Sequence, residues 1–268
     1  GNNNATTGII TGVDFSTGAL NMGTNSSGQL MYEPGFFTKD TKPGKQVLSG
    51  YKLSLSRSGD TYKLTDVKKD NESVLRGYTT EGANFYPLDS IRNDNPDSAN
   101  DNDHNDYFGM RYDIEFKIGD YLGDLNYTFK GDDDLWAVLD AKENGGNVVI
   151  DLGGIHSALD KSVDLWKTIL RNDNYEPEDR KNLSEDERNK THSLTILYME
   201  RGAYASNCQM EFTLPNSKVI NSEEAAKSLT FRKTTTSGNA LAGATFTLYA
   251  SDGTAVKDTA VSSADGTV

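Results

Sequence analysis

The stretch that decides the fold is FGMRYDIEFKI, residues 108–118. Every second residue from Phe108 to Ile118 is apolar, and the residues between them are glycine or charged. A period of two is typical of a β-strand that buries one face and exposes the other to solvent. The stretch therefore predicts a strand of an antiparallel sheet.

Shorter segments with the same period lie on both sides of this strand. Leu125, Tyr127 and Phe129 alternate after a Gly/Asp-rich turn, and we expect them to form a hairpin with residues 108–118. Gly59 and Asp60 separate two further segments and indicate a second hairpin. The two arms of that hairpin are residues 51–56 and 62–64. The remaining expected strands are residues 135–139, 148–150, 194–199 and 208–214. So many short strands predict an all-β fold, either a sandwich or a jelly roll.

Helical signals are confined to two segments. Leu159, Val163, Trp166 and Leu170 are spaced by four, three and four residues, which predicts one amphipathic helix over residues 158–170. Residues 184–187, Ser-Glu-Asp-Glu, have the capping-box pattern and predict a short exposed helix inside the polar stretch 171–190.

The charge balance excludes some classes of partner. The 268 residues include 27 Lys and Arg against 40 Asp and Glu, a formal net charge of −13. A chain with this net negative charge is not expected to bind nucleic acid or an anionic membrane surface, because both are negatively charged. We also expect no membrane insertion, because no apolar run approaches the roughly 18–20 residues of a spanning helix. The single cysteine, Cys208, excludes a disulfide framework and is interpreted as a small buried side chain.

One acidic stretch, residues 94–106, contains five Asp and resembles the start of a calcium loop. It lacks the EF-hand pattern, because position six is Asp106 instead of glycine and position twelve is Tyr112 instead of Glu. A solvated loop and an irregular calcium site both remain open for it.

A second acidic motif lies between two apolar strands, where Asp132, Asp133 and Asp134 follow one another. Adjacent carboxylates repel, and burial strengthens the repulsion. A calcium ion, Ca2+, would remove the conflict, since it is bound by carboxylate oxygens; the alternative is an exposed acidic turn. Asp151 ends another strand and is the fourth candidate metal ligand.

The residues that follow Asp151 are candidates for the remainder of the site. Gly153 and Gly154 would let backbone carbonyls approach an ion or ligand closely. His156 follows them, although such a histidine, taken alone, is more often a structural hydrogen-bonding residue than a ligand.

Four separated blocks together resemble the fibro-slime domain, a relative of the PA14 β-sandwich. The blocks are residues 104–110, 129–140, 148–156 and 194–201, the last followed by Ser206 and Asn207. The resemblance covers about residues 88–214. It implies a PA14-like sandwich in which two adjacent Asp, joined by a cis peptide, hold calcium. That pair is Asp132 and Asp133, with Asp133 and Asp134 as the alternative register.

The same resemblance implies a ligand. The open positions of the calcium ion would take vicinal hydroxyls of a glycan, with Gly153, Gly154, His156 and Trp136 as ligand-binding candidates. We rank His156 ahead of Trp136, because alternation puts Trp136 on one face with Val138, and that face can equally be core.

The tail has a resemblance of its own. Residues 229–234 and 238–249 look like the first half of a SpaA- or Cna-B-type pilin domain of Gram-positive surface proteins. Lys233 matches that family's isopeptide-forming lysine, whose Asn partner we expect after Val268. The expected organisation is thus a fibro-slime/PA14-like domain at 1–220 and a partial prealbumin-like (SpaA/Cna-B) sandwich at 228–268.

These expectations favour a surface adhesin module that binds a carbohydrate or another surface ligand in a calcium-dependent way. The alternative is a structural stalk or tip module whose calcium is purely structural. Localisation is expected to be extracellular and cell-wall anchored, with other pilin or surface subunits as further partners. An enzyme is not expected, although Asp133 with Asp151 would be the carboxylate pair for glycoside hydrolysis.

Overall fold

The structure, a computed structural model, describes residues 4–30, 32–51, 55–64, 85–88, 105, 107–202, 206–220, 232–249 and 256–268. It divides into two compact units, Gly1–Asn221 and Ser222–Val268. Two predicted segments lie partly or mostly outside the described residues. The acidic stretch 94–106, which includes His104, is described only at Asn105, and the expected strand 51–56 lacks Lys52 to Ser54.

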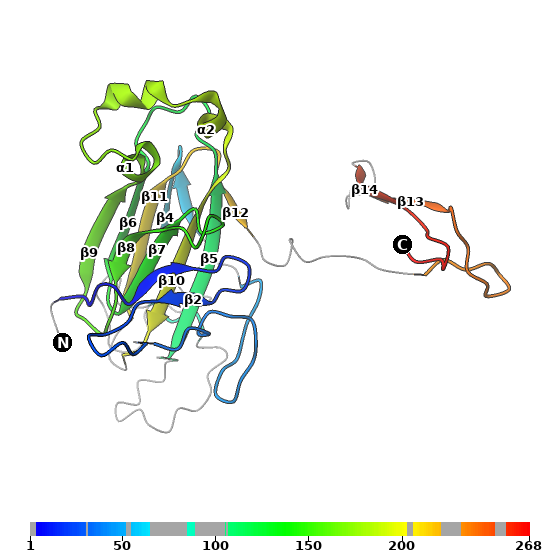
Figure 1. Cartoon of the computed structure of the whole chain (residues 1–268), viewed down its shortest axis with the longest axis horizontal. Coiled ribbons are helices and arrows are strands. Elements are labelled where there is room, and N and C mark those ends of the chain that lie inside the picture. The colour runs from blue at the N-terminus through cyan, green and yellow to red at the C-terminus, as the bar shows by residue number, and fades with distance from the viewer. Residues whose placement is uncertain are drawn as a thin grey trace. The chain divides into compact units, whose positions relative to one another are not determined.

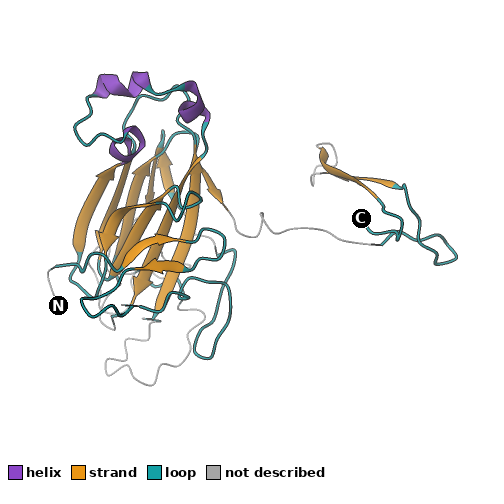
Figure 2. Cartoon of the chain, viewed as in Figure 1, coloured by secondary structure: helices purple, strands orange, loops and turns teal. Residues whose placement is uncertain are grey.

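The described part of the first unit contains two five-stranded antiparallel sheets and one two-stranded sheet, and the helices gather at one end of the two larger sheets (Figures 1 and 2). The first sheet has the order β12 (Lys218–Ile220), β5 (Phe108–Phe116), β10 (His192–Glu200), β7 (Asp134–Leu139) and β8 (Asn147–Leu152). The second has the order β3 (Ser56–Ser58), β4 (Thr61–Leu64), β11 (Cys208–Thr213), β6 (Asn126–Gly131) and β9 (Leu159–Asp164). The predicted all-β fold is confirmed.

The strand at 108–118 is confirmed as β5, but its expected hairpin with 125–129 is wrong. β5 pairs with β10 and β12, whereas β6 pairs with β11 and β9 in the other sheet. Both strands alternate because each buries one face between the sheets, and alternation alone does not say which strands are neighbours. The hairpin around Gly59 and Asp60 is confirmed as β3 and β4.

Strand β7 is buried along its whole length, so it belongs to two hydrophobic clusters. Leu135, Ala137 and Leu139 lie in the main core, which contains side chains of both sheets. Trp136 and Val138 point the other way, into a second cluster. There they pack with side chains of β1 (Ile10–Val13) and β2 (Leu20–Met22), a hairpin that covers the outer face of the first sheet.

The expected helix over 158–170 is only half correct. Residues 159–164 form β9, which pairs with β6, and α1 (Leu165–Leu170) begins after Asp164, whose carboxylate caps the helix by accepting from Trp166 N. Within 171–190 there are a 3₁₀ helix (Pro177–Asn182) and α2 (Glu185–Asn189), which has Ser184 as its N-cap as predicted. No helix among the described residues is long and apolar enough to cross a membrane.

The second unit contains one antiparallel pair, β13 (Thr245–Tyr249) and β14 (Val256–Val261). Ser262 is buried and fixes the chain beside this pair, because its Oγ accepts from Ala244 N and donates to Leu241 O. Lys233 donates its backbone N–H to Gly266 O.

Candidate functional site

The three consecutive aspartates precede and begin β7, at the end of the sandwich far from α2. The register shows this, because Asp134 pairs with Met199 near the end of β10, whereas α2 precedes the start of β10. Asp133 adopts a left-handed conformation with φ 57°, which Asp tolerates better than most residues. The cis peptide implied by the resemblance is not found, since the described residues contain no cis peptide bond.

Asp134 is fully buried, and its partners are protein groups. Its Oδ1 accepts from Gly154 N at 2.6 Å and from the Tyr32 hydroxyl at 3.0 Å, and its Oδ2 accepts from Arg201 Nε at 2.6 Å. Burial raises the pKa of Asp134, and the positive charge of Arg201 opposes that rise. A guanidinium therefore serves as the counter-ion of this carboxylate.

Asp132 points toward the start of β11. Its Oδ1 accepts from Asn207 N at 2.7 Å, and its Oδ2 accepts from the Asn207 carboxamide. Burial raises the pKa of Asp132 to about 6, against the lowering effect of these hydrogen bonds, and the charge of Asp133 adds to the rise.

Asp133 faces the end of β10. Its Oδ2 accepts from Arg201 N at 2.7 Å, while its Oδ1 accepts no hydrogen bond from the described residues. Glu200 is the neighbouring acid and is 1% exposed. It accepts from the Tyr198 hydroxyl and from Gly202 N, both at 2.9 Å. Burial, followed by the charges of Asp133 and Asp132, raises the pKa of Glu200 to about 9.

Three residues of the site, Glu200, Arg201 and Asn207, were not predicted from the sequence. All three belong to the segment that closes the fibro-slime resemblance, but there they served only to mark the end of a strand. The usable signal was a Glu-Arg pair directly after the apolar run of β10, because a buried strand that ends in two opposite charges needs partners for both.

The other predicted site residues lie toward the N-terminal segment. Asp151 accepts from Trp136 Nε1 at 2.9 Å and from Gly8 N at 2.7 Å. Trp136 is fully buried, so its ring has no face open to a ligand in this structure. His156 is 3% exposed; its Nδ1 lies 2.9 Å from Ser157 O, and its Nε2 has no hydrogen-bond partner in the part of the chain that the structure describes.

The structure therefore brings the predicted residues together in pairs, Asp134 with Gly154 and Trp136 with Asp151. Gly153 instead bridges to Thr6 through two backbone hydrogen bonds. Among the described residues, no three His, Cys, Asp or Glu side chains are placed to hold a metal ion. Asp133 and Glu200, which are buried, and Asp132, which is half-buried, nevertheless fit a cation by their chemistry, because their charges repel one another and the described residues supply no donor to Asp133 Oδ1.

Comparison with known proteins gives partial matches. Residues 227–268 match the family model of the SpaA prealbumin-like fold domain. Three similar proteins come from Dictyostelium discoideum. Protein psiC is 34% identical, and the match covers 39% of this chain and 19% of psiC. Protein psiD is 31% identical over 46% of this chain and 21% of psiD, and protein psiK is 28% identical over 59% of this chain and 20% of psiK. The chain thus spans about a fifth of these relatives.

No solved structure matches the chain. The pilin-like resemblance of the tail is confirmed by the family match, so residues 227–268 are similar to the SpaA prealbumin-like fold domain.

Proposed function

We propose that the first unit is a ligand-binding module of an extracellular surface protein, and that it recognises a carbohydrate or another surface ligand with the help of a bound calcium ion. In this proposal the site lies at Asp132 and Asp133, and the pilin-like second unit connects the module to the rest of a surface assembly.

The observation that carries the proposal is an excess of buried carboxylates. Burial, with a smaller contribution from the charge of Asp133, raises the pKa of Asp132 to about 6, and burial followed by the charges of Asp133 and Asp132 raises the pKa of Glu200 to about 9. The nearby cation, Arg201, already forms its ion pair with Asp134. Buried like charges persist where a cation or protons neutralise them. A hard divalent cation bound by carboxylate oxygens would meet this requirement.

Four residues would hold the cation: Asp132, Asp133, Glu200 and Asn207. When bound, calcium would neutralise the acids and offer open coordination positions to hydroxyl oxygens. The chain's own contribution is to fix the carboxylates beforehand. Asn207 orients Asp132 through two hydrogen bonds, and the Arg201 backbone orients Asp133.

The ligand class and the location rest on sequence. The fibro-slime and PA14 resemblance supports glycan recognition, and the match of the tail to the SpaA domain supports a cell-wall-anchored surface protein. The partners would be a glycan or host-surface ligand together with other pilin or surface subunits.

One observation favours a second candidate, a structural module without glycan binding. Asp134, Asp151 and Gly154 all have protein partners in this structure. A site completed by Arg201 would stiffen the end of the sandwich without recognising anything.

A glycan array with the parent chain and an Asp133→Ala variant separates the two candidates. Each protein is applied with calcium and with a chelator. The proposal expects glycan binding by the parent that both the chelator and the substitution abolish. Parent binding that survives both changes would reject the cation-dependent site, and no binding by either protein would favour the structural module.

A further inference from the structure

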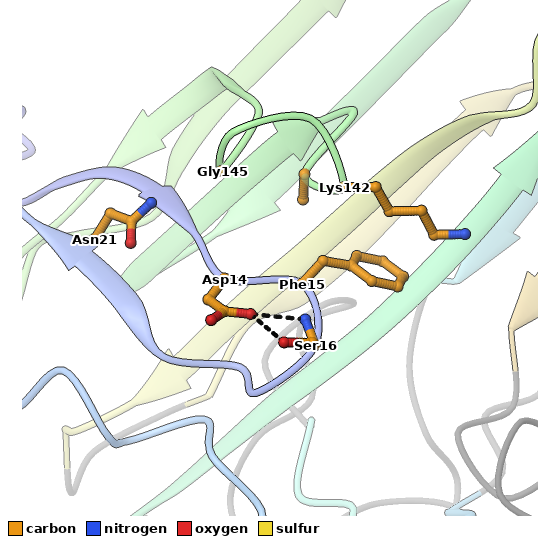
Figure 3. Close-up of a pocket in the computed structure, with 7 residues that line it drawn as sticks. Asp14, Phe15, Ser16, Asn21, Lys142 and Gly145 are labelled. Carbon is orange, nitrogen blue, oxygen red and sulfur yellow. Dashed lines mark hydrogen bonds between the residues drawn. The ribbon is translucent and has the colours of Figure 1, made fainter.

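A hollow of about 470 Å³ lies between the turn that joins β1 to β2 and the turn that joins β7 to β8 (Figure 3). It is far from the acidic site, because Asp134 begins β7 whereas the second turn follows the end of that strand at Leu139. Its lining residues are Asp14, Phe15, Ser16, Asn21, Ala141, Lys142 and Gly145.

The two turns are fixed to each other before any ligand arrives. Val13 N donates to Gly145 O at 3.0 Å, which joins them directly. Gly12 permits the approach, since a Cβ at this position would lie 2.5 Å from Gly145 O. The first turn is also closed internally, because Asp14 Oδ1 accepts from the N–H groups of Ser16 and Thr17. A rigid site of this kind loses little conformational entropy on binding.

The polar groups of the hollow leave hydrogen-bonding capacity for a ligand. The Asn21 carboxamide is exposed and makes no hydrogen bond to the described residues, and the same part of the chain supplies no donor to Asp14 Oδ2. Lys142 Nζ lies 2.5 Å from Glu115 and 4.8 Å from the ring centroid of Phe15. Phe15 is half-buried and lines the hollow beside Lys142 (Figure 3), and the Arg111 guanidinium also lies 5.2 Å from the centroid of its ring.

These groups select a ligand class by charge and by hydrogen bonding. One carboxylate and one ammonium line the hollow, and the ammonium already pairs with Glu115, so the lining offers an anionic ligand no unpaired cation. The Asn21 carboxamide can both donate and accept hydrogen bonds, and Asp14 Oδ2 can accept one. Hydroxyl groups match this lining, because a hydroxyl can also both donate and accept. The volume lies within the roughly 300–1,000 Å³ of small-molecule sites.

We propose that this hollow is a binding site for a neutral saccharide, and that it works without a metal ion. In the bound state Asn21 donates to and accepts from ring hydroxyls, and Asp14 Oδ2 accepts from a hydroxyl. The site is independent of Asp133 and of calcium, so it stands or falls separately from the function proposed above.

The test is a ¹H–¹⁵N NMR titration of the full chain in a chelator, using glucose, galactose, mannose and N-acetylglucosamine in turn. We expect saturable shifts of the Asn21 side-chain amide and the Gly145 backbone amide with at least one sugar below about 50 mM, a range that covers weak millimolar binding. Asn21→Ala and the isosteric Asn21→Asp should each weaken binding about tenfold, as expected for the loss of hydrogen bonds worth about 1.4 kcal/mol.

The matched control is Glu143→Gln, at an exposed position of the turn between β7 and β8 but outside the lining, and it should bind like the parent. Thermal melting confirms that each variant is folded. The proposal is overturned if no sugar gives saturable shifts, if the Asn21 variants bind as tightly as the parent, or if binding appears only with calcium and is lost in Asp133→Ala. The last result would support the acidic site instead.

Discussion

Arg201 places its Nε 2.6 Å from Asp134 Oδ2, although the two residues are 67 positions apart in the sequence. Asp134 is fully buried, whereas the Arg201 side chain keeps 28% of its surface exposed. The guanidinium also lies 4.7 Å from the ring centroid of Tyr32. One of three consecutive carboxylates thus has a cation supplied by the chain, and the described residues form no ion pair with the other two.

Removing this cation should be costly. Arg201→Ala leaves a buried carboxylate without its counter-ion, and we expect a loss of about 3 kcal/mol in the free energy of unfolding, the lower end of the range because Arg201 is partly exposed. Arg201→Lys should lose less, since it keeps the charge but not the Nε geometry. Urea denaturation measures both. Lys181→Ala, which removes an exposed ion pair with Glu178, is the control and should cost at most about 0.5 kcal/mol. Equal losses in Arg201→Ala and the control would contradict this account.

A second arginine holds the 171–190 segment on the sandwich. The guanidinium of Arg188 donates to the carbonyl oxygens of Leu183, Gly119, Arg180 and Lys181 at 3.0–3.2 Å. Arg188→Ala leaves these acceptors without their donor, and we expect a loss of about 2–3 kcal/mol.

Hydrogen exchange gives a local readout for the same variant. The Gly119 amide, which donates to Arg188 O, should exchange faster in Arg188→Ala. Lys167→Ala, on the exposed side of α1, should leave this amide protected. Unchanged protection in Arg188→Ala would show that other contacts hold the segment.

The lowered pKa of Asp140 leads us to expect a loss of stability in acid. Burial by itself raises the pKa of Asp140, but hydrogen bonds from His192 and Ser193 and the charge of Lys190 outweigh it, and the net pKa is lowered. Lys190 is also within 4.0 Å of Glu143 and Glu187. Because the unfolded chain binds the proton first, this contribution is complete above the unfolded pKa of about 3.9 and is lost as the pH falls through the folded pKa.

The measurement compares the parent with Asp140→Asn by urea denaturation at several pH values. The parent should be more stable at neutral pH, and the difference should shrink below about pH 4, where Asp140 takes up its proton. A difference that stays constant down to the lowest pH would mean that the carboxylate charge contributes nothing.

A substitution at Gly12 tests the close contact between the two turns that border the hollow. A Cβ at this position would meet Gly145 O at 2.5 Å, so Gly12→Ala must push the two turns apart. We expect a loss of about 1–3 kcal/mol, typical of overpacking, with weaker protection of the Val13 amide. Thr11→Ala, at the neighbouring exposed position, should change stability by less than about 0.5 kcal/mol. Melting curves and hydrogen exchange decide the point, and a Gly12→Ala variant as stable as the parent would contradict the described contact.

Strands with a clear period of two were predictable from the sequence, but their neighbours were not. The apolar runs of β5, β7 and β10 were all recognised. The pairing of β10 between β5 and β7 depends on contacts between residues that are 55 to 92 positions apart, which no local pattern encodes. The expected β5–β6 hairpin failed for this reason.

The first half of the helix predicted over 158–170 was wrong for a different reason. Leu159 and Val163 are four residues apart, a spacing that serves both a helix and one face of a strand, so it could not decide between them. The capping Asp164 marks the true start of α1.

The candidate site was likewise predictable only in part. The Asp132–Asp134 motif was visible because three adjacent acids between apolar strands are unusual. Their separate partners, Asn207, Glu200 and Arg201, come from the end of β10 and the start of β11, and only the folded chain brings them close.

Calorimetric titration of calcium into the chelator-stripped chain tests the central proposal most directly, with Asp133→Ala as the variant and Asp120→Ala, in an exposed turn, as the control. The account predicts saturable binding by the parent and the control. It also predicts stabilisation by about 2.7 kcal/mol at 100 times the Kd. Both effects should be absent from Asp133→Ala. A parent chain that takes up no calcium and melts at the same temperature with and without the chelator would contradict the cation-dependent site.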